Sequence, residues 1–235
     1  MSALAGRTAL VTGASKGIGF AISQKLAEAG ANVVMVARTR RELQASACEL
    51  DAGAFVADVA DARSVNRLLG ALAERAIRPE ILVNNAGLFK IAQLLDTTPE
   101  DFESTLRTNV MAPFLLARAL APAMRGAGRG HIVTIGSIAD RHAYAGNAAY
   151  AASKFGARAM HQVLREEMRG SGIRVSLVSP GPTDTPLWDP IEPDSKPGLT
   201  PRTSMLEPDA VGDAVLYVVT RPPEVNIDEL RVSRS

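Results

Sequence analysis

Cysteine and histidine are scarce in this 235-residue chain, which contains one cysteine, Cys48, and three histidines. A single cysteine cannot form an internal disulfide, so the chain is not a disulfide-stapled secreted scaffold. The histidines are scattered along the sequence, and together with one cysteine they offer no zinc-ligand spacing. We therefore expect no metal site.

The sequence also lacks a charge excess and any long apolar run. Twenty-six Lys and Arg residues balance 25 Asp and Glu residues, for a formal net charge of +1. This balance gives no overall attraction to nucleic acid or acidic membranes. No apolar stretch approaches the roughly 18 residues that a membrane span needs. Residues 1–6 do not begin a signal peptide, so we expect a cytoplasmic protein.

Short apolar segments rich in Val, Ile and Leu alternate with longer helix-like segments. The predicted strands are 8–11, 33–37, 54–57, 81–83, 132–135, 175–178 and 225–230. The predicted helices are 18–29, 39–50, 61–76, 99–124, 148–169 and 207–219. Most strands are apolar throughout, which is typical of a parallel sheet covered on both faces. The pattern predicts one α/β domain over 1–235, a doubly wound parallel β-sheet of about seven strands flanked by helices.

One region departs from this alternation, because eight of the 14 prolines lie from Pro180 to Pro208. Proline removes backbone donors, which excludes regular helix or central strand there. We expect a substrate loop at about 182–206, since long loops are often lids or binding loops; a flexible insertion is the alternative. The loop carries Leu187 and Trp188, the only tryptophan, and these apolar groups favour closure over a ligand.

A glycine-rich turn separates the first predicted strand from the first helix. Glycines permit a tight turn whose backbone N–H groups approach a pyrophosphate at the helix N-terminus. The spacing G-x-x-x-G-x-G is one residue wider than the common fingerprint, yet its place predicts the dinucleotide site of a Rossmann fold rather than a structural turn. The candidate cofactor-binding residues here are Gly13, Ser15, Lys16, Gly17, Ile18 and Gly19.

Cations rather than a carboxylate follow the second predicted strand. A site that prefers NAD places Asp or Glu there, whereas Arg38 follows Ala37 in this chain. Arg38 and Lys16 suit the 2′-phosphate of NADP(H), which we expect to be preferred over NAD(H); a solvated basic helix start is the alternative. After the third strand, Asp58 and Val59 could contact adenine, or Asp58 could cap the next helix.

Four polar residues suggest proton-transfer chemistry. Tyr150 and Lys154 are four residues apart, so a helix places them on one face. A free tyrosine has a pKa of about 10, which an ammonium and an oxidised nicotinamide would lower. Ser137 follows the fifth strand and faces the ligand crevice of such folds. Asn109 lies within a predicted helix, where Asn has poor propensity.

Taken together, these motifs resemble those of the short-chain dehydrogenase/reductase family, compact single-domain type, over essentially the full chain. The matching residues are Gly13, Gly17, Gly19, Asp58, Asn84, Asn85, Ala86, Gly87, Asn109, Ser137, Tyr150, Lys154, Pro180 and Gly181. The resemblance implies hydride transfer between a nicotinamide cofactor and a carbonyl or secondary alcohol substrate.

The resemblance also implies a role for each catalytic residue. Tyr150 would act as general acid or base, and Ser137 would hydrogen-bond the substrate oxygen. Lys154 would bind the nicotinamide ribose and lower the pKa of Tyr150, and Asn109 would hold a water of the proton relay. Further cofactor contacts would come from Asn85, Ala86, Gly87, Pro180, Gly181, Thr183 and Thr185.

The expected substrate pocket is largely apolar and suits a small or medium carbonyl compound. Its substrate-binding residues are predicted to be Ser137, Tyr144, Tyr150, Leu187 and Trp188, and neighbouring positions that could line it are Leu88, Phe89, Ile138 and His142.

Apolar or small residues on the long helices could pair across a two-fold axis in a homodimer or homotetramer; core packing is the alternative. These residues are Phe102, Leu106, Phe114, Ala152, Ala159 and Val163. A catalytically silent, dinucleotide-binding regulatory protein is the alternative function, but Tyr150 and Lys154 are both present. A sugar-nucleotide epimerase or dehydratase would need a larger C-terminal domain.

Overall fold

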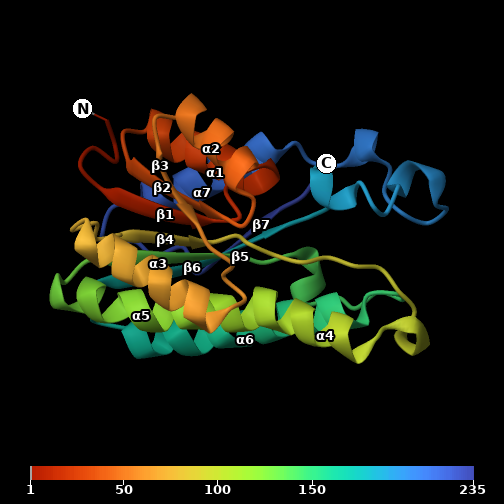
Figure 1. The fold of residues 1–235 in the computed structure, drawn as a ribbon. Helices are drawn as coiled ribbons and strands as arrows, with labels where there is room; N and C mark the ends of the chain where they lie inside the picture. The colour runs from red at the N-terminus through yellow and green to blue at the C-terminus, as the bar shows by residue number, and fades with distance from the viewer. Residues whose placement is uncertain (1) are drawn as a thin grey trace.

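The computed structural model describes residues 2–235 and is built around a parallel seven-stranded sheet (Figure 1). Its strands lie in the order β3-β2-β1-β4-β5-β6-β7, and each neighbouring pair is parallel. The strands are β1 (Thr8–Thr12), β2 (Asn32–Ala37), β3 (Gly53–Val56), β4 (Ile81–Asn84), β5 (Gly130–Ile135), β6 (Ile173–Pro180) and β7 (Glu229–Val232). Strand order reverses between β1 and β4, where folds of this kind bind ligands. The predicted doubly wound sheet is confirmed.

Helices cover both faces of the sheet (Figure 1). One face carries α1 (Gly17–Glu28), α2 (Arg40–Glu49) and α7 (Pro208–Val219). The other carries α3 (Ala62–Glu74), α4 (Pro99–Leu106), α5 (Ala112–Gly126) and α6 (Ala148–Met168). In β1, Ala9 and Val11 pack in the core beside α1 and α7, whereas Leu10 packs in the core beside α3 and α5. Burial on both faces explains why the strands are apolar throughout.

The helix predicted over 99–124 is interrupted, which the sequence analysis did not foresee. A π-helical turn, η2 (Arg107–Met111), separates α4 from α5. Asn109 lies in this turn and hydrogen-bonds the backbone of Leu88. Single π turns often mark functional positions in helices, so the polar misfit noted in the sequence coincides with a change of helix type.

The strand predicted over 225–230 begins later, at Glu229. Asn226 accounts for the difference, because its side chain, and not the backbone of a neighbouring strand, hydrogen-bonds the Val175 backbone in β6. Its Nδ2 donates to the Val175 carbonyl at 3.0 Å, and its Oδ1 accepts from the Val175 N–H at 3.1 Å. Parallel pairing with β6 then starts at Leu177.

The proline-rich segment is folded into short 3-10 helices, η4 (Pro186–Trp188), η5 (Pro193–Ser195) and η6 (Arg202–Ser204). Arg202 binds Asp184 and Asp189, each at 2.5 Å, and an isolated bridge joins Thr183 to Leu206. These contacts favour an organised loop over a flexible insertion. Two further 3-10 helices are η1 (Leu94–Asp96) and η3 (Ile138–Asp140). Within residues 2–235, no helix is long and apolar enough to cross a membrane.

Candidate active site

The glycine turn between β1 and α1 is tied to the segment that follows β4. Asn85 Nδ2 donates to the carbonyls of Thr12 at 2.9 Å and Gly13 at 3.2 Å. Thr12 Oγ1 accepts from the N–H groups of Asn85 and Ala86, both at 3.0 Å. At Gly19, a Cβ would lie 2.2 Å from the Gly13 carbonyl oxygen. The turn therefore requires glycine and brings the predicted residues Gly13, Gly19, Asn85 and Ala86 together.

Lys16 and Arg38 both lie exposed beside this turn. Lys16 Nζ is 3.5 Å from a carboxylate oxygen of Glu42 in α2, a residue that the sequence analysis missed. This pair is solvent-exposed and is therefore weak. Arg38 has no ion-pair partner within residues 2–235, so its guanidinium is free to bind an anion.

Asp58 and Val59 follow β3, as expected. Asp58 Oδ1 accepts a hydrogen bond from the N–H of Ala60 at 3.0 Å. The cap of α3 is instead Asp61, which accepts from the N–H groups of Arg63 and Ser64, so the alternative that Asp58 caps the helix is wrong. Asp58 is exposed and Val59 is buried.

Tyr150 and Lys154 lie in the first two turns of α6, beside the end of β5. Lys154 Nζ donates to the Ile135 carbonyl at 2.9 Å and lies 5.5 Å from the centre of the Tyr150 ring. Ser137 follows Ile135 by two residues, and its side chain is close enough to Tyr150 to lower the pKa of that phenol. The structure thus brings Ser137, Tyr150 and Lys154 together, as the sequence predicted.

Burial controls the protonation of the two helix residues. Burial raises the pKa of Tyr150 to about 12, and the nearby Ser137 side chain opposes this in part. Burial also lowers the pKa of Lys154 to about 8. In the chain alone the pKa of Tyr150 is raised and not lowered, because burial is the largest influence on it. At neutral pH the phenol is protonated, as a general acid must be.

Asn109 joins two parts of the site. Its Oδ1 accepts from the Leu88 N–H at 2.8 Å, and its Nδ2 donates to the Leu88 carbonyl and to Ser153 Oγ, both at 2.9 Å. Both amide hydrogens are therefore used within the protein. In the structure Asn109 fixes the segment after β4 against α6, next to Lys154.

Phe89 connects Tyr150 to the proline-rich loop. Its ring centroid lies 4.7 Å from that of Tyr150 and 4.9 Å from that of Trp188, in edge-on contacts. Trp188 Nε1 donates to the Thr183 carbonyl at 3.0 Å, which orients the indole. Phe89 is the residue that places the loop tryptophan against the catalytic site.

The other predicted residues lie at varying distances from this centre. Thr185 packs on the glycine turn, since a Cβ at Gly17 would be 3.1 Å from its methyl group. Gly181 donates its N–H to the Val232 carbonyl at 2.8 Å, at the end of β6. Leu187 and Tyr144 are 42% and 51% exposed, so they remain at the surface.

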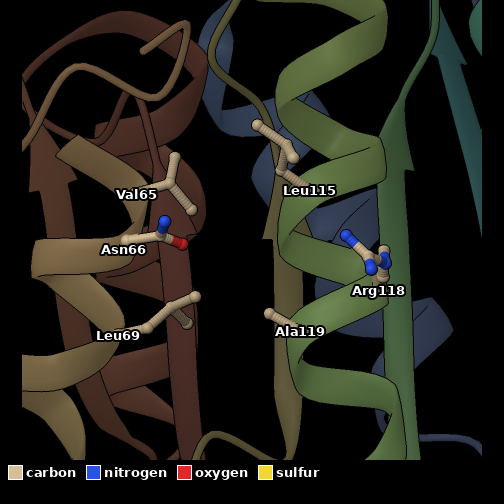
Figure 2. A pocket seen from close by; sticks show the side chains of 6 residues that line it. All are labelled: Val65, Asn66, Leu69, Leu115, Arg118 and Ala119. Atoms are coloured by element: carbon tan, nitrogen blue, oxygen red, sulfur yellow. The ribbon is translucent and has the colours of Figure 1, made fainter. Parts of the chain in front are cut away.

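Neither of two described cavities coincides with the predicted site. One, of about 230 Å³, lies between α3 and α5, where Val65, Leu69 and Leu115 face one another (Figure 2). The other, of about 380 Å³, is lined by residues near Arg174 and Asp228. None of the predicted site residues lines either cavity. The candidate site is therefore described by the contacts among its own residues.

Asp140 was not among the predicted site residues, yet its side chain is fully buried three residues after Ser137. Its Oδ1 pairs with Arg141 Nε at 2.8 Å, and its Oδ2 accepts from the Ser179 hydroxyl. A charged residue directly after the apolar pair Ile138 and Ala139 was the available signal.

Comparisons with known proteins find relatives that match over nearly the whole chain. D-threitol dehydrogenase of Mycolicibacterium smegmatis is 37% identical over 92% of this chain and 87% of its own length. Sepiapterin reductase of Chlorobaculum tepidum is 32% identical over 94% of this chain and 93% of its own length. A metagenomic short-chain oxidoreductase solved in complex with NADP is 35% identical, with a TM-score of 0.85 and coverage of 100% and 99%.

A second solved structure, the closed form of a serine dehydrogenase complexed with NADP+, is 30% identical with a TM-score of 0.87. The match covers 95% of the present chain and 93% of the serine dehydrogenase chain. Residues 7–196 match the model of the short chain dehydrogenase family. From fold, motifs and relatives alike, the chain belongs to the short-chain dehydrogenase family.

Proposed function

We propose that the protein is an NADP(H)-dependent oxidoreductase that interconverts a carbonyl compound and a secondary alcohol, with Tyr150 as general acid or base. The observation that carries this proposal is the meeting of Tyr150, Lys154 and Ser137 at the end of β5. A silent regulatory protein would not need these three groups together.

The residues around the glycine turn fit a dinucleotide. Lys16 is the N-cap residue of α1, and its side chain makes no capping hydrogen bond within residues 2–235. The first N–H groups of the helix therefore remain available to a pyrophosphate. Arg38 would bind the 2′-phosphate. Lys16 would bind the same phosphate after giving up its weak ion pair with Glu42. The exposed Asp58 and the buried Val59 would border the adenine. The bound nicotinamide would supply or accept the hydride.

Lys154 would hold the nicotinamide ribose. An ammonium has three donors, and the Ile135 carbonyl takes one of them, which leaves two for ribose hydroxyls. Pro180, Gly181, Thr183 and Thr185 would border the nicotinamide end, and Gly87 would lie beside the cofactor.

Tyr150 and Ser137 would act on the substrate oxygen. In carbonyl reduction Tyr150 gives its phenolic proton to the oxygen as negative charge develops there. Ser137 Oγ already accepts from the Ala139 N–H at 3.1 Å, so its own hydrogen can be donated to the same oxygen. In alcohol oxidation the Tyr150 phenolate would take the proton from the substrate hydroxyl, while the carbon gives up its hydride to the bound nicotinamide. Asn109 would support a water-mediated path for the Tyr150 proton.

The substrate would lie beside Phe89 and Trp188, since the Phe89 ring contacts the rings of both Tyr150 and Trp188. An aromatic wall with few polar groups suits a small or medium carbonyl compound. Leu187 and Tyr144 would join the pocket when loop 182–206 closes, and this loop would be part of a single NADP-binding domain over 1–235.

Copies of the chain would associate through the helices on the α4, α5 and α6 face. Phe102, Phe114 and Val163 are 37%, 44% and 57% exposed, so they are not core residues of the monomer. A two-fold axis would bury this surface in a homodimer or homotetramer. We also propose a cytoplasmic enzyme without a nucleic-acid or membrane partner.

A cofactor-oxidation screen tests the function. NADPH consumption at 340 nm would be followed with a panel of ketones, aldehydes, quinones and acyl thioesters, and NADP+ reduction with secondary alcohols. Turnover of at least one carbonyl or alcohol class supports the proposal. Cofactor binding without turnover of any class would favour the silent regulatory alternative.

A further inference from the structure

Asp140 is a charged residue whose side chain is 0% exposed. Burying a carboxylate is costly unless it is paired and hydrogen-bonded. Here Oδ1 pairs with Arg141 Nε at 2.8 Å, while Oδ2 accepts from the Ser179 hydroxyl and, at 3.5 Å, from the N–H of Ser137. The carboxylate is therefore held directly against the backbone of the candidate catalytic serine.

The packing around Gly136 shows how closely this carboxylate approaches the catalytic segment. A Cβ at Gly136 would lie 2.7 Å from Asp140 Oδ2 and 2.5 Å from Ser179 Oγ. Gly136 separates Ile135, whose carbonyl binds Lys154, from Ser137. One buried side chain thus touches the three-residue segment that contacts both catalytic helix residues.

Ion pairs extend from Asp140 to the last strand. Arg141 Nη2 lies 2.9 Å from Glu229 Oε2 in β7, and Glu229 Oε1 lies 3.3 Å from Arg158 Nε in α6. The two carboxylates and two guanidinium groups alternate, so this chain of pairs carries no net formal charge. It anchors Asp140 to β7 and, through Arg158, to α6.

Asp140 is the charged group from outside α6 that acts on the catalytic pair. Lys154 Nζ binds the Ile135 carbonyl, next to the segment that Asp140 holds. Burial has the largest effect on the pKa of each helix residue, and for Tyr150 the lowering by Ser137 comes second. The negative charge of Asp140 raises the pKa of both Tyr150 and Lys154.

We propose that Asp140 is a positioning residue whose buried carboxylate fixes the Ser137 segment and keeps Tyr150 in the proton-donating form. This inference rests on the proposed function, because it concerns the same tyrosine. It assigns a direction to the site, since a group that favours the phenol over the phenolate assists carbonyl reduction at neutral pH. Sequence position 140 would then be a determinant of the pH range of the enzyme.

Asp140→Asn tests the proposal, because the amide keeps the shape and removes the charge. We expect kcat to fall, and the pH profiles of both reaction directions to move to lower pH by about half a unit or more. Glu229→Gln is the matched control, since it removes a carboxylate from the same chain of pairs without a contact to Ser137. Its pH profile should overlie that of the wild type.

Ser179→Ala separates position from charge. This variant removes a hydrogen bond to Asp140 but keeps the carboxylate, so kcat should fall while the pH profile stays in place. Asp140→Ser serves as a second neutral variant if Asp140→Asn does not fold. Neutral variants whose pH profiles coincide with the wild type would overturn the proposal.

A readout without turnover distinguishes this proposal from the function itself. Tyrosine ionisation can be titrated by absorbance near 295 nm in the NADP+ complex, with Tyr150→Phe identifying the step that belongs to Tyr150. That step should occur at lower pH in Asp140→Asn. If the wild type turns over no carbonyl but the Tyr150 ionisation still shifts to lower pH in Asp140→Asn, the proposed function fails and the electrostatic role of Asp140 stands. If the ionisation does not shift, that role is overturned whether or not the enzyme turns over a carbonyl.

Discussion

Lys154 donates a hydrogen bond from its buried ammonium to the carbonyl oxygen of Ile135, 2.9 Å away. This bond links α6 to the end of β5 and holds the ammonium 5.5 Å from the Tyr150 ring centre. Because the carbonyl is backbone, the position of the ammonium follows from the sheet register, where Ile135 pairs with Val178. The sheet register therefore sets the geometry of the proposed active site.

The pKa of Lys154 sets the first prediction. Burial lowers it to about 8, so the ammonium loses its proton as pH rises through that value. Since the neutral amine binds ribose hydroxyls and stabilises a phenolate less well, kcat/KM for NADPH should decline above about pH 8. Lys154→Arg, whose guanidinium stays charged, should be less active at neutral pH and lack this decline. A decline that persists in Lys154→Arg would contradict the assignment.

Arg38 should decide the cofactor preference. We expect NADPH to bind at least about tenfold more tightly than NADH, because a charge-assisted contact to phosphate contributes roughly 1.5–3 kcal/mol. Arg38→Gln should remove most of this difference and leave NADH affinity unchanged. Arg78→Gln, an exposed arginine before β4, is the matched control. Equal calorimetric affinities of the wild type for both cofactors would overturn the prediction.

Two glycines with different surroundings test the turn. Gly19→Ala should destabilise the protein by about 1–3 kcal/mol and weaken cofactor binding, because its Cβ would meet the Gly13 carbonyl. Gly70 is an exposed residue of α3, and a methyl group added there would meet nothing within 4 Å. Gly70→Ala should therefore stabilise the protein by up to about 1 kcal/mol. Chemical denaturation measures both. Equal effects of the two substitutions would refute this account of the turn.

The exposed apolar face should associate. Sedimentation or gel filtration should give two or four times the chain mass of 24.8 kDa. Phe114→Asp places a charge on this face, where Phe114 is 44% exposed, and should shift the protein toward the monomer. A wild-type mass near 25 kDa would show that the face has another use.

Much of the fold followed from the sequence, for physical reasons visible in particular elements. Apolar runs such as Thr8–Thr12 are buried on both faces, which only a covered parallel sheet allows. Asp61 and Thr98 cap α3 and α4 through hydrogen bonds to nearby backbone N–H groups, an interaction that depends on local residue type. Tyr150 and Lys154 share a helix, so their proximity was a matter of local geometry.

Contacts between distant segments were harder to foresee. The π turn at Asn109 depends on the backbone of Leu88, 21 residues earlier, and Asn226 replaces a strand partner by binding Val175. The pairing of Asp140 with Ser179 crosses from η3 to β6. Neither helical nor strand periodicity contains such information, because these side chains are satisfied only once the sheet has formed.

The central claim is that Tyr150 exchanges the proton with the substrate oxygen. The most direct measurement compares Tyr150→Phe with the wild type in NADPH oxidation with the best substrate from the screen. The phenylalanine keeps the ring that packs on Phe89 but has no proton to give. The account predicts loss of turnover by at least about 100-fold with NADPH affinity nearly unchanged, whereas turnover close to that of the wild type would contradict it.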